Sequence, residues 1–206
     1  MSAFRRPAQL ALAATACLAL GGCISLFPKS KPAQLYRFDG DPLQASTVMP
    51  PATAKVIARG NLRFETAASA DRILTIDGRD TAYIAGARWI SPAPVLFEES
   101  LIRAFEAGGG VRLAEGGSAI HPVDVLNLDV QTFETRYDQG DKAAPQVMVQ
   151  VRAQLIRAND RSVIGEQLFT SAQRADDNRV GPIVQAYDAA VRDVLGKLVS
   201  WTAQQG

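Results

Sequence analysis

The sequence predicts an α+β fold in which a mainly antiparallel sheet carries two principal helices packed on one face. Two observations point to this class. Alternation of apolar and polar residues over 126–130 and 147–155 predicts long strands with one apolar face. Apolar residues spaced by three and four predict helices over 91–108 and 183–201. The other face of the sheet is expected to be at least partly free.

Four short strands are expected before the first helix. Their residue ranges are 35–38, 55–59, 72–76 and 81–84. A proline-rich loop over 39–52 follows the first strand, and Gly60-Asn61 is expected to end the second. Asp77-Gly78 is a hairpin turn signal, so the third and fourth strands are predicted to pair antiparallel.

The first helix is predicted to begin at Ser91-Pro92, because proline is favoured at the first helical position. Its apolar side chains at helical spacing are Phe97, Leu101, Ile102 and Phe105. The glycines at 108–110 are expected to end it, since glycine readily takes the left-handed conformation found after helices. A phosphate-binding loop is the disfavoured alternative, because that motif precedes its helix and continues with Lys and Ser or Thr.

Three long strands and a second helix complete the domain after a short strand at 111–114. A tight turn at 158–161 leads from the strand over 147–155 into a strand over 162–172, which predicts an antiparallel meander. The last helix is expected to follow Gly181-Pro182 and to run for about five turns. Its apolar stripe is predicted to cover one face of the meander.

The N-terminal segment has the pattern of a secretory signal peptide. Two arginines precede an apolar run over 10–20 that is too short to span a bilayer. The Leu-Gly-Gly-Cys sequence at 20–23 resembles the lipobox of bacterial lipoproteins. The resemblance implies that residues 1–22 are removed and that Cys23 carries a diacylglycerol and an N-acyl chain. The alternative is that Cys23 is a small apolar residue in an ordinary signal sequence or at the end of an uncleaved helix.

These patterns divide the chain into a lipoprotein signal peptide over 1–22, a lipidated N-terminus and tether over 23–34, and a single α+β domain over 35–206. The tether contains two prolines and two lysines and shows no sustained periodicity. An aspartate after the cysteine commonly retains bacterial lipoproteins at the inner membrane, and Ile24 stands there instead. By resemblance, the periplasmic face of the outer membrane is favoured over that of the inner membrane.

The charge balance and cysteine content of the mature chain argue against nucleic-acid binding and against disulfide bonds. Without residues 1–22, which include two arginines and no acid, 20 basic and 21 acidic residues remain. This balance gives no electrostatic footprint for nucleic acid. Cys23 is then the last cysteine, so the domain is expected to have no disulfide and to depend on an apolar core.

No motif for catalysis, cofactor binding or metal binding is found. His121 is the single histidine, and such a residue is more often a surface residue than a general base. Glu98-Glu99 would diverge by about 100° on a helix, and the spacing around Asp176-Asp177 does not fit a calcium loop. A non-enzymatic protein without cofactor, metal or catalytic residues is expected.

The order of short motifs along the domain resembles a known family. A Leu-Tyr-x-Phe strand at 35–38 is followed by an Arg-Ile strand at 72–73 and then by Tyr83. Arg88-Trp89 is expected to open a helix with the pattern Phe-x-x-x-Leu-Ile-x-x-Phe. These motifs resemble the ABC-type transport auxiliary lipoprotein component family. This family includes the paraquat-inducible lipoprotein partnered with MCE-domain lipid transporters.

The resemblance covers essentially the mature chain and implies a periplasm-facing accessory of an ABC-type system. Such a system would move lipid or another hydrophobic solute between inner and outer membrane. The chain departs from the family pattern at Ser91, where an acidic residue commonly precedes the proline. Tyr83 and Trp89 are candidate partner contacts, although core filling is the favoured interpretation of both. A lipid-binding carrier or sensor, and an outer-membrane assembly or structural lipoprotein, are the alternative functions.

Overall fold

The computed structural model describes residues 32–38, 54–108, 110–114, 122 and 124–205. The lipobox with Cys23, most of the tether, the loop expected over 39–52 and His121 lie outside these residues. The domain begins at Ala33, and from there the described residues form one compact unit.

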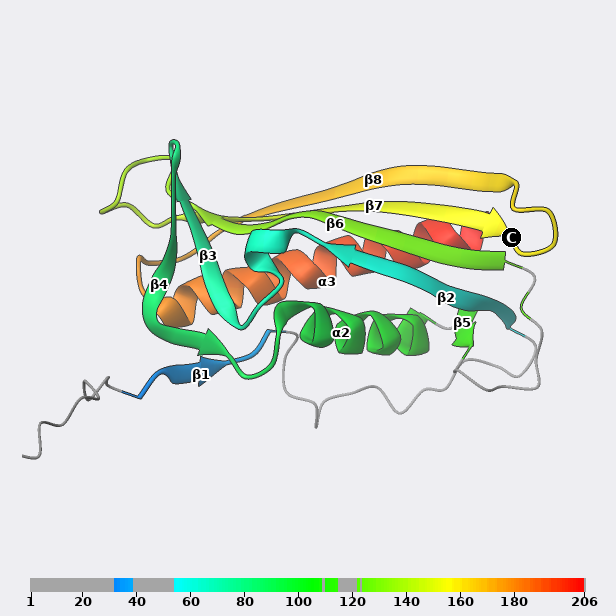
Figure 1. Ribbon diagram of the computed structural model, residues 1–206, viewed down its shortest axis with the longest axis horizontal. Coiled ribbons are helices and arrows are strands. Elements are labelled where there is room, and N and C mark those ends of the chain that lie inside the picture. Colours follow the sequence, from blue (N-terminus) through cyan, green and yellow to red (C-terminus); the bar gives the residue numbers. More distant parts are fainter. Residues whose placement is uncertain (1–31, 39–53, 109, 115–121, 123, 206) are drawn as a thin grey trace, which may run out of the picture. The chain divides into compact units, whose positions relative to one another are not determined.

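Eight strands of the described residues form one sheet, and two helices and a short 3-10 turn join it (Figure 1). The strands are β1 (Gln34–Tyr36), β2 (Lys55–Phe64), β3 (Arg72–Asp77), β4 (Asp80–Trp89), β5 (Val111–Ala114), β6 (Asp124–Arg136), β7 (Gln146–Arg157) and β8 (Val163–Arg174). The helices are α2 (Ala93–Gly108) and α3 (Val180–Gln204), and the 3-10 turn is η2 (Thr66–Ala68).

Strand β6 organises the sheet. It pairs antiparallel with β7 along one edge, and β7 pairs antiparallel with β8, so the predicted meander is confirmed. Along its other edge β6 pairs first with β2 and then with β3, both in parallel. The β3–β4 hairpin is also confirmed, with Gly78 in its turn at a φ of 57°. The longest ladders are antiparallel, which confirms the fold class, but the parallel pairings were not expected.

The expected break at Gly60-Asn61 was wrong, because β2 continues through it to Phe64. The pairing register between β2 and β6 shifts between Arg59 and Leu62, which marks a β-bulge. A Cβ at Gly60 would collide with the side chain of Asn127. The same Asn127 side chain accepts a hydrogen bond of 2.9 Å from the backbone N–H of Asn61. Glycine and asparagine therefore build a bulge here and not a turn.

The helix boundaries differ from expectation at three points. Arg88 and Trp89 end β4 and do not open a helix, and α2 begins at Ala93. Helix α2 ends at Gly108 as predicted. Helix α3 begins at Val180 and is 25 residues long, which exceeds the expected five turns. Pro182 lies inside its first turn, where a missing N–H costs nothing because those groups have no intrahelical acceptor.

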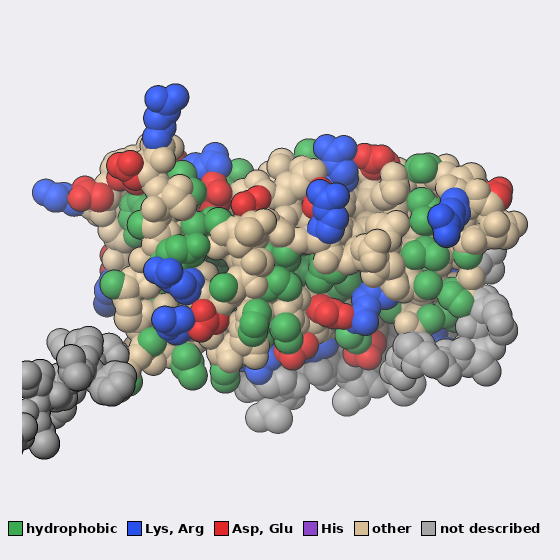
Figure 2. Space-filling view, viewed as in Figure 1, with side chains coloured by type: hydrophobic (Ala, Val, Ile, Leu, Met, Phe, Trp, Pro, Cys, Tyr) green, Lys and Arg blue, Asp and Glu red, His purple; other side chains and the backbone are tan. Residues whose placement is uncertain are grey.

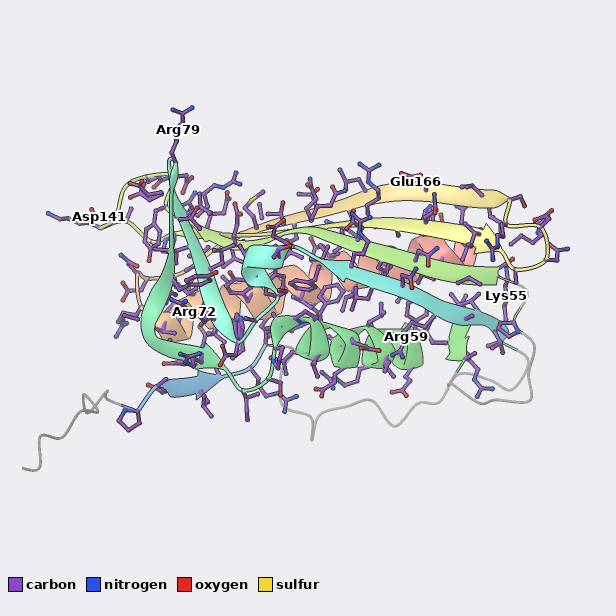
Figure 3. All side chains as sticks on the ribbon, in the orientation of Figure 1. Lys55, Arg59, Arg72, Arg79, Asp141 and Glu166 are labelled. Carbon is purple, nitrogen blue, oxygen red and sulfur yellow. The ribbon has the colours of Figure 1, made fainter. Side chains whose placement is uncertain are left out.

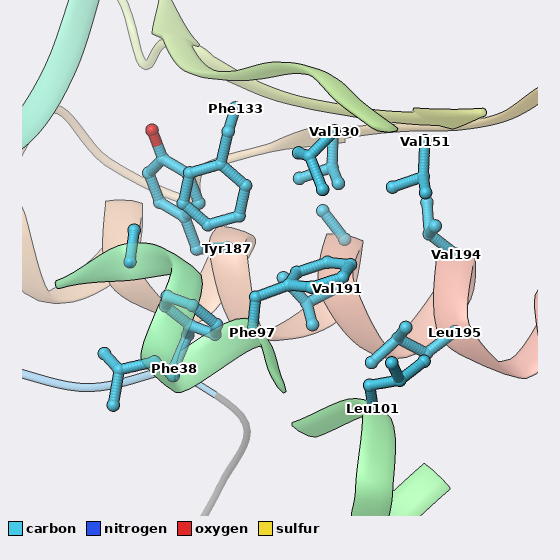
Figure 4. Close-up of a cluster of buried hydrophobic side chains, with 14 of the residues drawn as sticks. Phe38, Phe97, Leu101, Val130, Phe133, Val151, Tyr187, Val191, Val194 and Leu195 are labelled. Carbon is cyan, nitrogen blue, oxygen red and sulfur yellow. The ribbon is translucent and has the colours of Figure 1, made fainter. Parts of the chain in front are cut away.

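The two helices cover one face of the sheet and enclose the core. Helix α3 packs against β7 and β8, and α2 packs against α3 and β5. Figure 4 shows side chains of the sheet meeting those of both helices. The labelled residues of this cluster are Phe38, Phe97, Leu101, Val130, Phe133, Val151, Tyr187, Val191, Val194 and Leu195, all at most 2% exposed.

The opposite face of the meander is polar, as the alternation of β7 predicts. Gln150, Arg152 and Gln154 point away from the core, and Arg152 forms an ion pair of 2.9 Å with Glu166 on β8. Figure 3 shows Glu166 on this outer side. Neither described helix has a stretch long and apolar enough to cross a bilayer.

Candidate functional site

The structure places the two predicted contact residues differently. Trp89 lies in the core at 2% exposure, with ring centroids 5.1 Å from those of Phe38 and Tyr187. Tyr83 is partly buried, and its hydroxyl donates a 3.0 Å hydrogen bond to the carbonyl of Ala67. The guanidinium of Arg72 lies 3.7 Å from the centre of the Tyr83 ring, a cation–π contact. A partner contact at Tyr83 stays a prediction.

Three of the acidic residues noted in the sequence form ion pairs with different arginines. Glu98 forms an ion pair with Arg59 of β2 (labelled in Figure 3), and Glu99 forms one of 3.3 Å with Arg37. Asp177 pairs with Arg179 at 2.6 Å. In the described part of the chain, no three His, Cys, Asp or Glu side chains gather as a metal ion would need.

A groove lies between β8 and the C-terminal half of α3, and it is the candidate site. It has a volume of about 660 Å³. Its lining residues are Gln167 and Phe169 of β8 together with Arg192, Asp193, Gly196, Lys197, Ser200, Trp201 and Gln204 of α3. We call it the β8–α3 groove. Since β8 pairs only with β7 among the described strands, one edge of β8 has no strand partner.

Two glycines shape the β8–α3 groove. Gly165 lets the end of α3 approach β8 closely, because a Cβ there would lie 3.1 Å from Trp201. The ring of Trp201 meets Phe169 edge to face with centroids 5.8 Å apart, so these rings form an apolar floor. Gly196 has open space where a side chain would stand, and the groove is therefore hollow above this floor.

The rim of the β8–α3 groove is charged but internally paired. Lys197 forms an ion pair of 2.7 Å with Asp193, and its ammonium also donates to the carbonyl of Thr170 at 3.4 Å. Arg192 pairs with Asp188 one turn earlier. Partial burial opposes ionisation of Asp193, but hydrogen bonds from Lys197 and Ser171 outweigh this effect and lower the pKa of Asp193.

We expect the carboxyl of Asp193 to titrate below the ordinary aspartate pKa of about 3.9. Its ionised form then adds stability above that pH, and this contribution is lost as the pH falls through the lower folded-state pKa. NMR titration of the side-chain carboxyl measures this midpoint. Lys197→Met should raise it, while Lys142→Met in the β6–β7 loop should leave it unchanged. An equal midpoint in both variants would contradict the assignment to Lys197.

This arrangement suits recognition of an extended chain. An unpaired strand edge offers main-chain donors and acceptors, and a segment that adds to it can place alternate side chains in an adjoining groove. The sequence analysis missed this site because the groove is formed by two elements, and neither β8 nor α3 carries a recognisable binding motif in its own sequence. The available signal was Gly196, a glycine inside a helical pattern, which often marks a packing or functional position.

Solved structures share the fold. A crystal structure of a Xanthomonas campestris protein assigned to family model DUF330 gives a TM-score of 0.68 at 24% identity, covering 84% of this chain and 97% of that chain. A crystal structure of an uncharacterized protein gives 0.61 at 12% identity, covering 85% and 99%. At these identities the likeness shows the fold alone. Comparison with curated proteins gave no match.

The protein is therefore an α+β domain of a class already seen in crystal structures. The model of the ABC-type transport auxiliary lipoprotein component family matches residues 36–199, and the chain belongs to this family. The resemblance drawn from the sequence motifs is confirmed. The family is one of lipoproteins that serve as auxiliary components of ABC-type transport.

Proposed function

We propose that this protein is a membrane-tethered, non-enzymatic accessory of an MCE-linked ABC transport system. The system would move lipid or another hydrophobic solute between the inner and outer membranes. The family match over residues 36–199 carries this proposal, because it supplies the transport role. The MCE partner and the direction between membranes go beyond the family description and follow from the sequence resemblance.

The anchor in this proposal is the lipid on Cys23, and Ile24 favours the periplasmic face of the outer membrane. An anchored domain searches only the volume within reach of its tether. Its effective concentration toward a membrane-bound partner can then reach millimolar values. A contact too weak to be useful in free solution would suffice for an accessory protein held in this way.

The docking site in this proposal is the β8–α3 groove. Its open β8 edge and its floor of Phe169 and Trp201 support binding of an extended segment from the periplasmic component of the transporter. Paired charges on the rim leave no strong excess of either sign, which favours a partner segment of mixed or low charge.

Packing argues against the lipid-carrier alternative at the helix–sheet interface. Tyr187, Val191 and Val194 of α3 are 0% exposed and lie against equally buried valines of β7. Side chains therefore fill the space where a lipid would lie between this helix and the sheet. Native mass spectrometry of the purified protein checks this, and a retained lipid would favour the carrier. An assembly or structural lipoprotein shares the anchor and differs in its partner.

Gly196→Trp tests the docking site, because an indole at this position fills the open space of the groove. Gly181→Trp is the matched control, since Gly181 also lies on α3 with open space around it but outside the groove. We expect Gly196→Trp to weaken co-purification with the cognate MCE-domain component by about tenfold or more, equivalent to about 1.4 kcal/mol.

The control variant should bind the MCE-domain component as the unmodified protein does. Equal binding by both variants would exclude the groove as the docking site while leaving the transport role intact. Failure of the unmodified protein to co-purify with its cognate system would count against the transport role itself.

A further inference from the structure

Exposed apolar side chains concentrate on one surface of the domain. Six large hydrophobic residues in the described part of the chain are exposed, and four of them lie on β1, at the end of β4 and on α2. These four are Leu35 at 56%, Ile90 at 55%, Val95 at 44% and Ile102 at 37% exposure. The other two, Val163 and Leu168, lie on β8.

Backbone pairing places Leu35 and Ile90 on the same face of two neighbouring chain segments, with Leu35 opposite Arg88. Strand β1 pairs in parallel with the end of β4, with Tyr36 opposite Trp89. The N–H of Ile90 donates a 2.8 Å hydrogen bond to the carbonyl of Tyr36. Since Trp89 points into the core and side chains alternate along a strand, Leu35 and Ile90 point outward.

An ion pair joins this strand end to α2. Val95, Glu99 and Ile102 are spaced by four and three residues, so they share one face of the helix. Arg37, directly after β1, forms the 3.3 Å ion pair with Glu99. This ion pair links the strand end that carries Leu35 and Ile90 to the helix face that carries Val95 and Ile102, and we call these four residues and the ion pair the β1–α2 surface. Figure 2 shows hydrophobic side chains over β1 and the start of α2.

The charges around the β1–α2 surface neutralise one another. Glu98 pairs with Arg59, and Arg88 pairs with Asp71 at 2.8 Å. With Arg37 paired to Glu99, the arginines of these three ion pairs provide no basic excess for anionic lipid headgroups. Membrane contact at this surface would therefore depend on the apolar side chains. Interfacial protein segments bind bilayers by burying such side chains at the headgroup boundary.

The chain itself indicates what covers this surface. Leu35 lies twelve residues after Cys23 in the sequence, and an extended chain of that length reaches at most about 40 Å. The described chain enters the domain at β1, so the β1–α2 surface is where the tether arrives. A lipid on Cys23 would therefore hold the bilayer within reach of this surface.

We propose that the β1–α2 surface rests on the membrane that holds the lipid of Cys23, with its four exposed apolar side chains in the interfacial region. This inference rests on the proposed lipidation of Cys23. Strands β1 and β8 are the two ends of the path β1-β4-β3-β6-β7-β8 through the sheet. Contact at β1 leaves the β8–α3 groove away from the lipid and open to a partner.

Single cysteine variants test this orientation in the mature full-length lipoprotein. In that form Cys23 is lipidated, so an introduced cysteine is the single reactive thiol. Leu35→Cys and Val95→Cys report on the β1–α2 surface, and Val163→Cys and Leu168→Cys are matched exposed controls on β8. Each is labelled with an environment-sensitive fluorophore and reconstituted in phosphatidylcholine vesicles that contain a spin-labelled lipid quencher.

We expect quenching at residues 35 and 95 to exceed that at 163 and 168 by about threefold or more, because fluorophores on the β1–α2 surface would contact the lipid. Equal quenching at all four positions, or stronger quenching on β8, would overturn the orientation. Intact mass of each variant separates the two proposals. A modified Cys23 with equal quenching rejects only the orientation, whereas an unmodified Cys23 rejects the anchor and the orientation together.

Discussion

Cys23→Ser is expected to transfer the protein from the membrane fraction to the soluble periplasmic fraction almost completely. The serine hydroxyl cannot form the thioether that would hold the diacylglycerol on Cys23, so the proposed acyl chains would be lost. Each buried methylene contributes about 0.8 kcal/mol, and two or more chains make attachment nearly permanent. Membrane fractionation followed by immunoblotting measures the change, which should exceed about a hundredfold in the membrane-to-soluble ratio.

Cys17→Ser is the matched control for this experiment. Cys17 lies in the apolar run of the signal segment, which would be removed with residues 1–22. This variant should stay membrane-bound, and intact mass should show the same lipidated mature protein as the unmodified chain. A Cys23→Ser protein that still fractionates with membranes would show that another part of the chain provides the attachment.

The strands that could be predicted are those whose local pattern agrees with their environment. Strand β7 and the first half of β6 alternate because one face lies on the helices and the other is polar, and alternation is visible in a short window. The alternation of β6 breaks after Val130, where its register with β7 shifts. Asp77-Gly78 marks the β3–β4 turn for a similarly local reason, the positive φ of Gly78.

The parallel pairings could not be predicted, because each joins segments that are far apart in the sequence. Strand β2 pairs with β6, and neither strand's own sequence indicates which strand it pairs with. The bulge at Gly60-Asn61 is a related case. Both residues are typical of turns, and the side chain of Asn127, more than sixty positions away, decides that they form a bulge.

The functional sites also differ in whether a local sequence pattern or distant residues define them. Cys23 can be proposed as a lipidation site from the sequence alone, because a signal segment acts as a linear motif that processing enzymes read before folding. The β8–α3 groove depends on Gly165 of β8 and Gly196 of α3, and these two elements come together only when the sheet and helix pack. Trp89 belongs to the core for the same reason: its contacts with Phe38 and Tyr187 span most of the chain.

Phe133→Ala is expected to destabilise the domain by about 3–5 kcal/mol, the cost typical of removing a buried phenylalanine ring. Phe133 is 1% exposed and lies at the centre of the aromatic cluster. Its ring centroid is 5.3 Å from Phe38, 5.2 Å from Phe64, 6.4 Å from Trp89 and 4.9 Å from Tyr187. These partners come from β2, β4, α3 and the segment after β1, so one cavity would loosen four parts of the fold.

Urea denaturation measures this loss as a lower midpoint with little change in slope. Leu168→Ala, at an exposed position on β8, should change stability by less than about 0.5 kcal/mol. Tyr187→Phe should cost an intermediate amount, about 0.5–1.5 kcal/mol, because it removes the buried 3.2 Å hydrogen bond from the Thr135 hydroxyl. If Phe133→Ala cost no more than Leu168→Ala, the aromatic cluster would not be the centre of the core.

Since β1 joins the core through Phe38, a loosened cluster would also free the strand on which the β1–α2 surface depends.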